Sequence, residues 1–406
     1  MEITHIIIRV IEVVVFLLSS FAVSYILVFG IAALFPYHNR KPSEQTLRRF
    51  AVMIPGYKED AVIVGVAQDV LHQNYPKEYF DVIVIADSFK PETLNALRQL
   101  PITLIEVKFD ISKKSKALNT AMKVLGDEYD VAMILDADNI INPDVIELLN
   151  QSFDNGFVAV QGHRLAKNLN TSFAILDAIS EEINNNLFRK GHRVLGFSAA
   201  LIGSGMALDY KLFKSVMATI DSVGEDKEVE MKLLEAGHKI DYVHHAYVFD
   251  EKTQQPQAFV NQRRRWLAAQ FIYFRQYFFS GAKQLILKGN YDFFDKVLQM
   301  IQPPRILLAG SLLIYFFISV IIHTLSQDIV LLFPAWSWLL LFGITAFVLL
   351  INTPRKFYNR NLFKAILSLP KGFALMLWSL LRIKGAGQRF IHTQHTHIDP
   401  VMKRSK

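Results

Sequence analysis

Three long stretches of the chain consist almost entirely of apolar residues and carry no formal charge. They cover residues 13–35, 306–325 and 329–351. A helix as long as the first stretch spans roughly 34 Å, which exceeds the roughly 30 Å hydrocarbon core of a bilayer. The pattern therefore predicts three transmembrane helices, with residues 326–328 as a tight turn between the last two.

Each of these predictions has an alternative. The first stretch resembles a cleavable signal peptide, but the apolar core of such a peptide is only about 7–15 residues long and small residues follow it. Here the stretch is longer and ends in the bulky Leu34-Phe35-Pro36. The other two could be buried helices of a soluble core. Because they are apolar all round, we favour membrane spans.

Residues 362–381 are less uniform, since Lys364, Pro370 and Lys371 interrupt the apolar pattern. We expect this segment to be a helix that lies in the membrane interface. A fourth membrane span is the alternative.

Between the first and second apolar stretches, short apolar runs alternate with helical patterns. This alternation predicts an α/β domain with a parallel sheet. The predicted strands cover residues 49–55, 80–86, 103–107 and 131–135, and the predicted helices cover residues 62–71, 92–100 and 116–125.

Composition supports a membrane protein and excludes several other classes. Apolar residues make up 51% of the chain and charged residues 20%, whereas a soluble domain averages about 25% charged residues. The 31 Phe and 14 Tyr are too many for a disordered chain or a coiled coil. Because Cys is absent, disulfides, thiolate zinc sites, iron–sulfur clusters and a cysteine nucleophile are excluded.

Basic residues are distributed unequally around the apolar stretches. By the positive-inside rule, the N-terminus lies outside, and residues 36–305 and the basic tail lie in the cytoplasm. The net charge of +7 then favours attraction to a lipid bilayer. We expect no nucleic-acid partner, because no basic stripe alternates with aromatic residues. The basic residues that set the orientation are Arg9 before the first stretch, Arg40, Lys41, Arg48 and Arg49 after it, and Arg355, Lys356, Arg360 and Lys364 after the third.

Polar residues follow three of the predicted strands. Tyr57 and Glu59 follow the first, Asp87 the second and Asp136 the fourth. Ligands bind beyond the carboxyl ends of the strands in open parallel sheets. We therefore expect these side chains to line one crevice.

Asp136 and Asp138 form an Asp-x-Asp pair directly after a buried strand. Two such carboxylates can ligate a hard divalent cation, since Mg²⁺ takes one or two protein carboxylates together with phosphate oxygens and water. A solvated turn is the alternative.

Two further segments are candidates for the same site. Gly203-Ser204-Gly205 precedes an apolar run, and glycines there would let the backbone approach a ligand closely, or form an ordinary turn. Glu225 and Asp226 open a predicted helix at residues 227–235. A carboxylate at that position acts as a helix cap or as a general base.

A run of three arginines and a tryptophan, Gln262-Arg263-Arg264-Arg265-Trp266, begins an aromatic stretch. It is typical of a helix on a membrane surface, where arginines extend toward the headgroups. In a functional interpretation, an arginine binds phosphate and the indole stacks on a sugar. Both interpretations can hold together.

These motifs together resemble those of membrane-embedded family 2 glycosyltransferases, a group that includes cellulose, chitin, hyaluronan and poly-N-acetylglucosamine synthases. The resemblance covers about residues 48–305. The residues that carry it, matching the order D, DxD, ED and QxxRW, are Tyr57-Lys58-Glu59, Asp87, Asp136-Ala137-Asp138, Glu225-Asp226 and Gln262-x-x-Arg265-Trp266.

The resemblance implies a GT-A-type, Rossmann-like α/β glycosyltransferase domain inserted between transmembrane helices. The implied organisation is a transmembrane helix (1–36), a cytoplasmic glycosyltransferase domain (37–260), the QRRRW segment with interfacial amphipathic helices (261–305), a transmembrane hairpin (306–351), and an interfacial helix with a basic cytoplasmic tail (352–406).

The resemblance also assigns roles to residues. Asp226 would be the catalytic base, and Mg²⁺ or Mn²⁺ would be held by Asp136 and Asp138. The acceptor would contact Glu225, Gln262 and Trp266. The nucleotide-sugar donor would contact Tyr57, Glu59, Asp87, Lys116, Asp136, Gly203, Ser204, Gly205 and Arg265.

The chain departs from the family pattern at two positions that bear on the nucleoside contacts. Lys58 replaces the usual Asn before Glu59, and Ser88 follows Asp87 without the common Asp-Gly-Ser turn. The segment around Lys116 matches the family's Lys-x-x-Ala-Leu-Asn pattern loosely.

The implied function is an inverting transfer of a sugar from a UDP-sugar to an acceptor hydroxyl, building a β-linked polysaccharide at a bacterial inner or plasma membrane. Accessory membrane or export proteins would be partners. One alternative is transfer of a single sugar to a lipid or lipid carrier, and another is a non-catalytic sensor or scaffold. A nicotinamide dehydrogenase is excluded, because residues 55–60 lack the Gly-x-Gly-x-x-Gly pattern.

Overall fold

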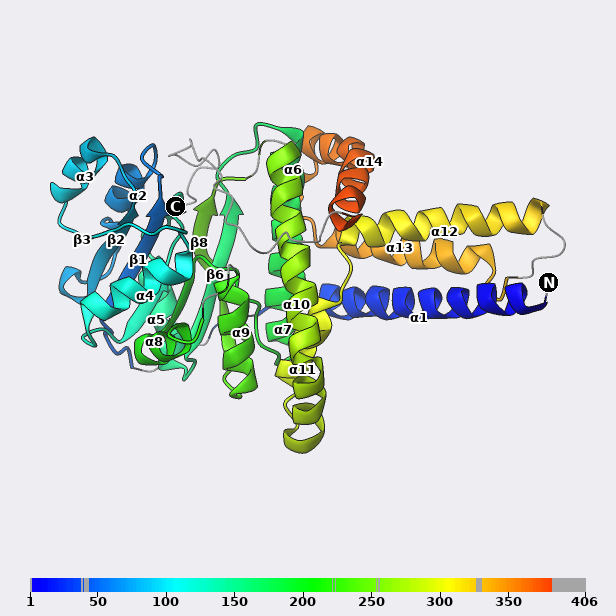
Figure 1. Cartoon of the computed structure of the whole chain (residues 1–406), viewed down its shortest axis with the longest axis horizontal. Helices are drawn as coiled ribbons and strands as arrows, with labels where there is room; N and C mark the ends of the chain where they lie inside the picture. Colours follow the sequence, from blue (N-terminus) through cyan, green and yellow to red (C-terminus); the bar gives the residue numbers. More distant parts are fainter. Residues whose placement is uncertain are drawn as a thin grey trace.

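The computed structural model describes residues 2–37, 39, 44–220, 222, 224–252, 254, 256–325 and 331–381. They form an α/β domain, a layer of helices beside it, and a bundle of long helices that extends from this layer (Figure 1).

The centre of the α/β domain is an eight-stranded mixed sheet in the order β3-β2-β1-β4-β7-β6-β8-β5. The first four strands in this order are parallel, as predicted, and β7 runs antiparallel to both β4 and β6. The strands are β1 (Phe50–Tyr57), β2 (Phe80–Asp87), β3 (Thr103–Val107), β4 (Val131–Ile134), β5 (Ile140–Ile141), β6 (Ala159–Ala166), β7 (Met206–Asp209) and β8 (Ile240–Asp250).

Helices cover both faces of this sheet, which explains why its strands read as continuous apolar runs. Along β1, Ala51 and Met53 face one core, whereas Phe50, Val52 and Ile54 face the other. The first core includes side chains of α4 (Lys114–Leu125), α8 (Tyr210–Met217) and α9 (Glu225–Glu235). The second includes side chains of α2 (Ile63–Val70), α3 (Pro91–Arg98) and α5 (Val145–Asp154), with the short η1 (Lys77–Tyr79) before β2.

Four helices form a layer between the sheet and the bundle, and they run crosswise to the bundle (Figure 1). We call them the crosswise layer. They are α6 (Ser172–Asn184), α10 (Pro256–Lys288), α11 (Tyr291–Met300) and α14 (Arg360–Leu381). After α6 the chain continues through a π-helical turn η2 (Asn185–Gly191) into the short α7 (His192–Val194).

The bundle consists of α1 (Glu2–Ala32), α12 (Arg305–Leu325) and α13 (Ala335–Ile351), which lie side by side (Figure 1). Three described helices, at residues 3–32, 305–325 and 362–380, are long and apolar enough to cross a membrane, and α13 is a shorter apolar helix. The third predicted span, 329–351, is helical only from residue 335, which follows Pro334. The predicted turn at 326–328 lies outside the described residues.

Apolar side chains fill the interior of the bundle. Val23, Ile26, Leu312, Trp338 and Val348 are among those that are buried there. The carboxylate of Glu12 accepts hydrogen bonds from the backbone N–H groups of Leu332 and Phe333, at 2.8 and 3.0 Å.

Helix α14 contacts α6, α10 and α12, and η3 (Arg355–Phe357) leads into it. It contains Pro370 and lies across the end of the bundle, unlike α12 and α13, which run along it (Figure 1). Length and composition would allow α14 to cross a membrane. Its direction favours the predicted position in the interface.

Candidate functional site

Two neighbouring strand ends form the first part of the site. Tyr57 and Asp87 are register partners at the ends of β1 and β2. The N–H of Lys58 donates to the carbonyl of Asp87 at 3.1 Å, and the Ser88 hydroxyl donates to the Asp87 carboxylate at 2.9 Å. Glu59, one residue beyond Lys58, is buried. The structure thus brings Tyr57 and Asp87 together, as expected.

Both departures from the family pattern lie at strained backbone positions. Lys58 has φ of 55° and Ser88 has φ of 60°. The left-handed region is costly for most side chains but is tolerated by Gly and by Asn. The usual Asn and Gly of the family suit this geometry, and the chain adopts it with less favourable residues.

The centre of the site is the ammonium group of Lys114, at the start of α4. It donates to the Asp136 carboxylate at 2.5 Å and to the carbonyl of Gly203 at 2.6 Å. It lies 4.0 Å from the carboxylate of Glu225. One lysine therefore joins the end of β4, the glycine loop and the start of α9.

Sequence reasoning placed Lys116 in the site and missed Lys114. The ammonium of Lys116 donates instead to the carbonyl of Ile111 at 3.2 Å, at an exposed position. Side chains two residues apart on a helix point to different faces. The available signal was the spacing of the Lys-x-x-Ala-Leu-Asn pattern, since its Lys falls on Lys114 when Ala117, Leu118 and Asn119 are its last three residues.

The charges in this cluster shift one another's pKa values. Burial raises the pKa of Asp136, but the charges of Lys114 and Arg164 outweigh it, so its pKa lies below the ordinary value. Burial raises the pKa of Glu225 to about 7 against the opposing charge of Lys114, and the carboxylate of Asp226 adds to the rise. Perturbed carboxylates of this kind are typical of functional sites, although structural ion pairs also produce them.

Asp226 faces the backbone of the glycine loop. Gly203 has φ of 77°, and a Cβ built on it would lie 3.4 Å from the carboxyl group of Asp226. Gly205 has φ of 62°, and its Cβ would lie 2.8 Å from Val248. Both positions therefore favour glycine. Ser204, between them, is buried.

Asp138 is buried and held by the backbone around it. Its carboxylate accepts the N–H of Glu251 at 2.6 Å and the Asn139 amide at 3.3 Å, and its carbonyl accepts the ammonium of Lys167 at 2.8 Å. Among the described residues no group of three or more His, Cys, Asp or Glu is placed to hold a metal ion. Asp136 and Asp138 supply the oxygen donors that Mg²⁺ or Mn²⁺ takes, but further ligands would have to come from a substrate.

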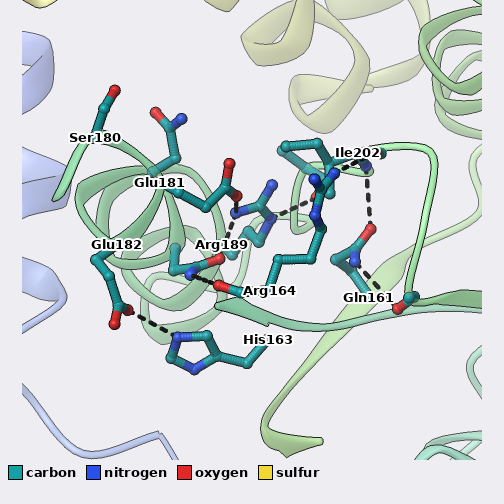
Figure 2. A network of polar contacts seen from close by, with 12 residues as sticks. Gln161, His163, Arg164, Ser180, Glu181, Glu182, Arg189 and Ile202 are labelled. Carbon is teal, nitrogen blue, oxygen red and sulfur yellow. Dashed lines mark hydrogen bonds and ion pairs between the residues drawn. The ribbon is translucent and has the colours of Figure 1, made fainter. Parts of the chain in front are cut away.

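Beside the site, β6, β8 and α6 share a buried network of ionic contacts, part of which Figure 2 shows. Arg164 pairs with Asp250 and donates to the carbonyl of Ile202 at 3.1 Å, next to the glycine loop. Lys252 lies 2.9 Å from Asp250 and 3.8 Å from Glu181. This network joins the wall of the site to the crosswise layer.

The arginine and tryptophan motif lies in the N-terminal third of α10, which begins at Pro256. Arg263 pairs with Asp177 on α6, and its guanidinium lies 4.4 Å from the centre of the Trp266 ring. Trp266 is 37% exposed, Gln262 is half-buried, and the side chain of Arg265 lies outside the described part. Further along α10, the Tyr273 hydroxyl donates to the carbonyl of Gly224 at 3.0 Å. Helix α10 therefore contacts the loop that precedes Glu225 and Asp226.

Comparison with known proteins gives one family match. The family model Glycosyltransferase like family 2 matches residues 48–269. Two curated relatives are Probable glycosyltransferase YdaM of Bacillus subtilis, 25% identical over 61% of this chain and 62% of its own length, and Beta-monoglucosyldiacylglycerol synthase of Trichormus variabilis, 22% identical over 68% and 59%. The chain therefore spans about three fifths of the length of these relatives.

A solved structure with a similar fold is the mannosyltransferase PcManGT of Pyrobaculum calidifontis, whose complex contains GDP-Man and Mn²⁺. The TM-score is 0.50 at 14% identity, and the match covers 84% of this chain and 97% of that one. At this identity the likeness shows a shared fold.

Proposed function

The chain belongs to the glycosyltransferase like family 2, and on this premise we propose that it transfers a sugar from a nucleotide sugar to the hydroxyl of an acceptor at a membrane surface. Its fold is the predicted GT-A-type α/β fold, with apolar helices on both flanks. The substrates, the reaction course and the residue roles below are part of the proposal.

The observation that carries the proposal is the cluster around Lys114. Asp136, Glu225 and Asp226 gather around one ammonium group and the open backbone of Gly203. A cation beside the carboxylates suits a negatively charged diphosphate, and the glycine leaves room for a sugar. A sensor or scaffold would need no carboxylate beside that space, which favours an enzyme.

The donor would lie along the strand ends. Tyr57, Glu59 and Asp87 would contact the nucleoside, for which UDP is the first candidate. The glycine loop would border the sugar, and Lys114 and Arg265 would contact the diphosphate. The donor contact predicted for Lys116 is assigned to Lys114 in its place, since the ammonium of Lys116 donates to the carbonyl of Ile111 at an exposed position.

Asp136 and Asp138 would hold Mg²⁺ or Mn²⁺ together with oxygens of the diphosphate. When bound, such an ion supplies positive charge at the diphosphate oxygens where negative charge develops. The complex of PcManGT with GDP-Man and Mn²⁺ supports a divalent ion.

The chemistry would be a single displacement. Asp226 takes the proton of the acceptor hydroxyl, whose oxygen bonds to the anomeric carbon as the bond to the diphosphate oxygen breaks. Lys114 and Arg265 lower the energy of the departing diphosphate. One displacement inverts the anomeric configuration, so an α-linked donor yields a β-linked product.

The acceptor would contact Glu225, Gln262 and Trp266, and its class has two candidates. The sequence resemblance favours a growing polysaccharide. The apolar interior of the bundle favours a lipid or lipid-linked acceptor, because most of the side chains buried between the three described helices are apolar. The relative that acts as a monoglucosyldiacylglycerol synthase supports the same candidate.

The bundle and the crosswise layer also support membrane attachment. The bundle would span the bilayer and the layer would lie at its cytoplasmic surface, since the layer runs crosswise to the bundle (Figure 1). The active site would then face an acceptor held at that surface. Accessory membrane or export proteins would be needed if the product is a polysaccharide.

One experiment tests both donor and acceptor. The full chain, purified in detergent with bacterial lipid, is incubated with labelled nucleotide sugars and Mn²⁺, and the products are separated by size and by extraction into organic solvent. We expect transfer from at least one donor, which excess chelator abolishes and added Mg²⁺ or Mn²⁺ restores. A ladder indicates a polysaccharide, and a single extractable band indicates a lipid. Transfer at full rate in chelator contradicts the metal role, and no transfer from any donor contradicts the function.

A further inference from the structure

Glu230 is a buried charge on the same helix as the proposed base. It lies on α9, one helical turn after Asp226, and none of it is exposed. Its carboxylate lies 2.7 Å from the ammonium of Lys296 on α11 and 2.9 Å from that of Lys227. Burial raises the pKa of Glu230, but the two ammonium groups outweigh it and hold the pKa below its ordinary value. Glu230 is therefore ionised in the core.

The same carboxylate binds the backbone that leads to the glycine loop. It accepts the N–H of Leu201 at 3.0 Å, while the ammonium of Lys227 donates to the Leu201 carbonyl. Glu230 and Lys227 thus form hydrogen bonds with the backbone N–H and the backbone carbonyl of Leu201, respectively. Two residues later comes Gly203, whose carbonyl accepts Lys114 and whose Cα faces Asp226.

We propose that Glu230 is a positioning residue, which sets the distance between the glycine loop and Asp226. Glu230 does so by fixing the backbone of Leu201 against α9, while the ion pair with Lys296 holds Glu230 to α11. This proposal rests on the proposed function, because the distance matters only if a sugar is transferred between Gly203 and Asp226. A misplacement of about 1 Å can reduce the rate by as much as 10²-fold.

The partner of Glu230 is itself well fixed. Lys296 donates to the Gln299 side chain at 2.6 Å, and Gln299 donates to Asp295 at 2.9 Å. Asp295 accepts the hydroxyl of Tyr25 on α1 at 2.7 Å and lies 3.2 Å from His192. A continuous set of buried polar contacts therefore connects Glu230 to the bundle. Such support is what gives a site its precision.

Replacing one member of a buried ion pair leaves the other charge uncompensated, which destabilises the fold. A loss of activity could then come from unfolding as well as from a misplaced loop. The test therefore changes both members together. In E230L/K296M the pair becomes apolar and Leu201 loses its acceptor. In E230Q/K296Q both charges of this pair disappear, whereas Lys227 keeps its charge and its bond to the Leu201 carbonyl. An amide oxygen remains to accept the Leu201 N–H.

The variants are compared as full chains in detergent, with thermal unfolding, nucleoside-diphosphate affinity and steady-state transfer. We expect E230L/K296M to fold and to bind the diphosphate with unchanged Kd, while kcat falls roughly 10–100-fold. E230Q/K296Q should retain kcat within about threefold, since the hydrogen bond to Leu201 persists. E228Q, which changes an ion pair with Lys232 near the surface of the same helix, is the control and should behave as wild type.

Wild-type kcat in E230L/K296M overturns the proposal. Loss of diphosphate affinity in parallel with kcat also overturns it, because a general structural role would then suffice. If E230L/K296M does not fold, E230D decides, since it keeps the charge but is one methylene too short to reach Leu201, and an unchanged kcat contradicts positioning. If the Asp226→Asn variant transfers sugar normally, the proposed role of Asp226 fails. If the wild-type chain transfers sugar from no donor, the proposed function fails instead.

Discussion

At Lys114 a single ammonium group is shared by Asp136, Gly203 and Glu225. Burial lowers the pKa of Lys114, but the carboxylates of Asp136 and Glu225 outweigh it and raise the pKa, so the charge is permanent near neutral pH. The ammonium group of Lys114 lies beside both carboxylates and donates a hydrogen bond to the glycine loop. Its removal should therefore affect catalysis more than a surface lysine would.

We predict that Lys114→Met reduces kcat/KM by roughly 10²-fold or more, a loss typical of removing one charge-stabilising group. Lys116→Met is the matched control, two residues along the same helix, and should retain near wild-type activity. Steady-state transfer with the accepted donor measures both. Equal losses in the two variants, or a larger loss for Lys116→Met, would contradict the assignment of the diphosphate contact to Lys114.

Glu225 gives a pH-dependent prediction. Its pKa rises from 4.5 in the unfolded chain to about 7 in the folded protein. Between these values the folded state holds a proton that the unfolded state has released. The stabilisation is thus fully present below the unfolded pKa and is lost as the pH rises through the folded one.

Glu225→Gln should remove this dependence, which amounts to roughly 1–3 kcal/mol. Thermal unfolding at about pH 5 and about pH 8 should show a smaller fall in Tm with pH for the variant than for the wild type. An equal fall in Tm with pH in both proteins would show that Glu225 is not the source of this pH dependence.

Among individual residues, sequence patterns predicted the places of Asp87 and Asp136 in the fold but not that of Lys114. Asp87 and Asp136 stand at strand ends, where the chain must leave the sheet, and the structure places them there. Which lysine of a helix reaches the site depends on the rotation of that helix. That rotation is set by packing of Ala117, Leu118 and Ala121 against the core. The Lys-x-x-Ala-Leu-Asn spacing agrees with this packing, since its Lys falls on Lys114, and the prediction of Lys116 was wrong by two residues.

At the scale of elements, α12 and α14 approach each other very closely. A Cβ built on Gly310 would lie 2.3 Å from the ring of Phe373, whereas one on Gly343 in α13 would meet nothing within 4 Å. Both glycines lie inside apolar helices. They therefore form a matched pair for testing the contact.

We predict that Gly310→Ala destabilises the protein by about 1–3 kcal/mol through overpacking, while Gly343→Ala is neutral or slightly stabilising because Ala favours helix. Thermal unfolding in detergent measures both. Equal stability of the two variants would mean that α14 does not pack on α12 as described.

The predicted strands β1 to β4 are confirmed because each is a short apolar run between turns. β6 and β8 were missed, since they carry polar residues such as Gln161, His163, Arg164, His244 and His245. His163 and Arg164 pair with Glu182 and Asp250 in the ionic network beside the site. A register shift between Gly162 and His163 also interrupts the strand pattern. Strands that carry polar side chains beside the site lack the continuous apolar run by which a buried strand is predicted from sequence.

At the scale of the whole molecule, the orientation of α14 relative to the bundle bears on topology. Helix α14 lies across the end of the bundle that is nearer to the α/β domain, so its last described residues stay on that side (Figure 1). Residues 382–406 themselves lie outside the described part. The basic residues after the third predicted span favour the same side.

A reporter fused to the C-terminus and active only outside the cytoplasm should therefore give no signal. A reporter at the N-terminus is the positive control and should give one. A strong signal from the C-terminal fusion would make α14 a fourth span and contradict the interfacial position.

The central claim is that Asp226 accepts the proton of the acceptor hydroxyl. The sequence allowed Asp226 to be a helix cap, but α9 begins at Glu225, its N-cap is Gly224 and no side chain caps it, so Asp226 lies in the first turn. Asp226→Asn is nearly isosteric, and a carboxylate in the first turn contributes about 0.3–1 kcal/mol through the helix dipole, so a purely structural role predicts a stability change of about 1 kcal/mol at most and normal activity. Asp136 and Lys114 remain in the variant, so nucleoside-diphosphate affinity should persist.

The decisive measurement is single-turnover sugar transfer by Asp226→Asn, with diphosphate binding measured on the same preparation. We predict wild-type Kd and a transfer rate lower by about 10²–10⁴-fold, the usual loss when a general base is removed. Transfer near the wild-type rate would contradict the mechanism and leave Asp226 with only a structural role in the first turn of α9.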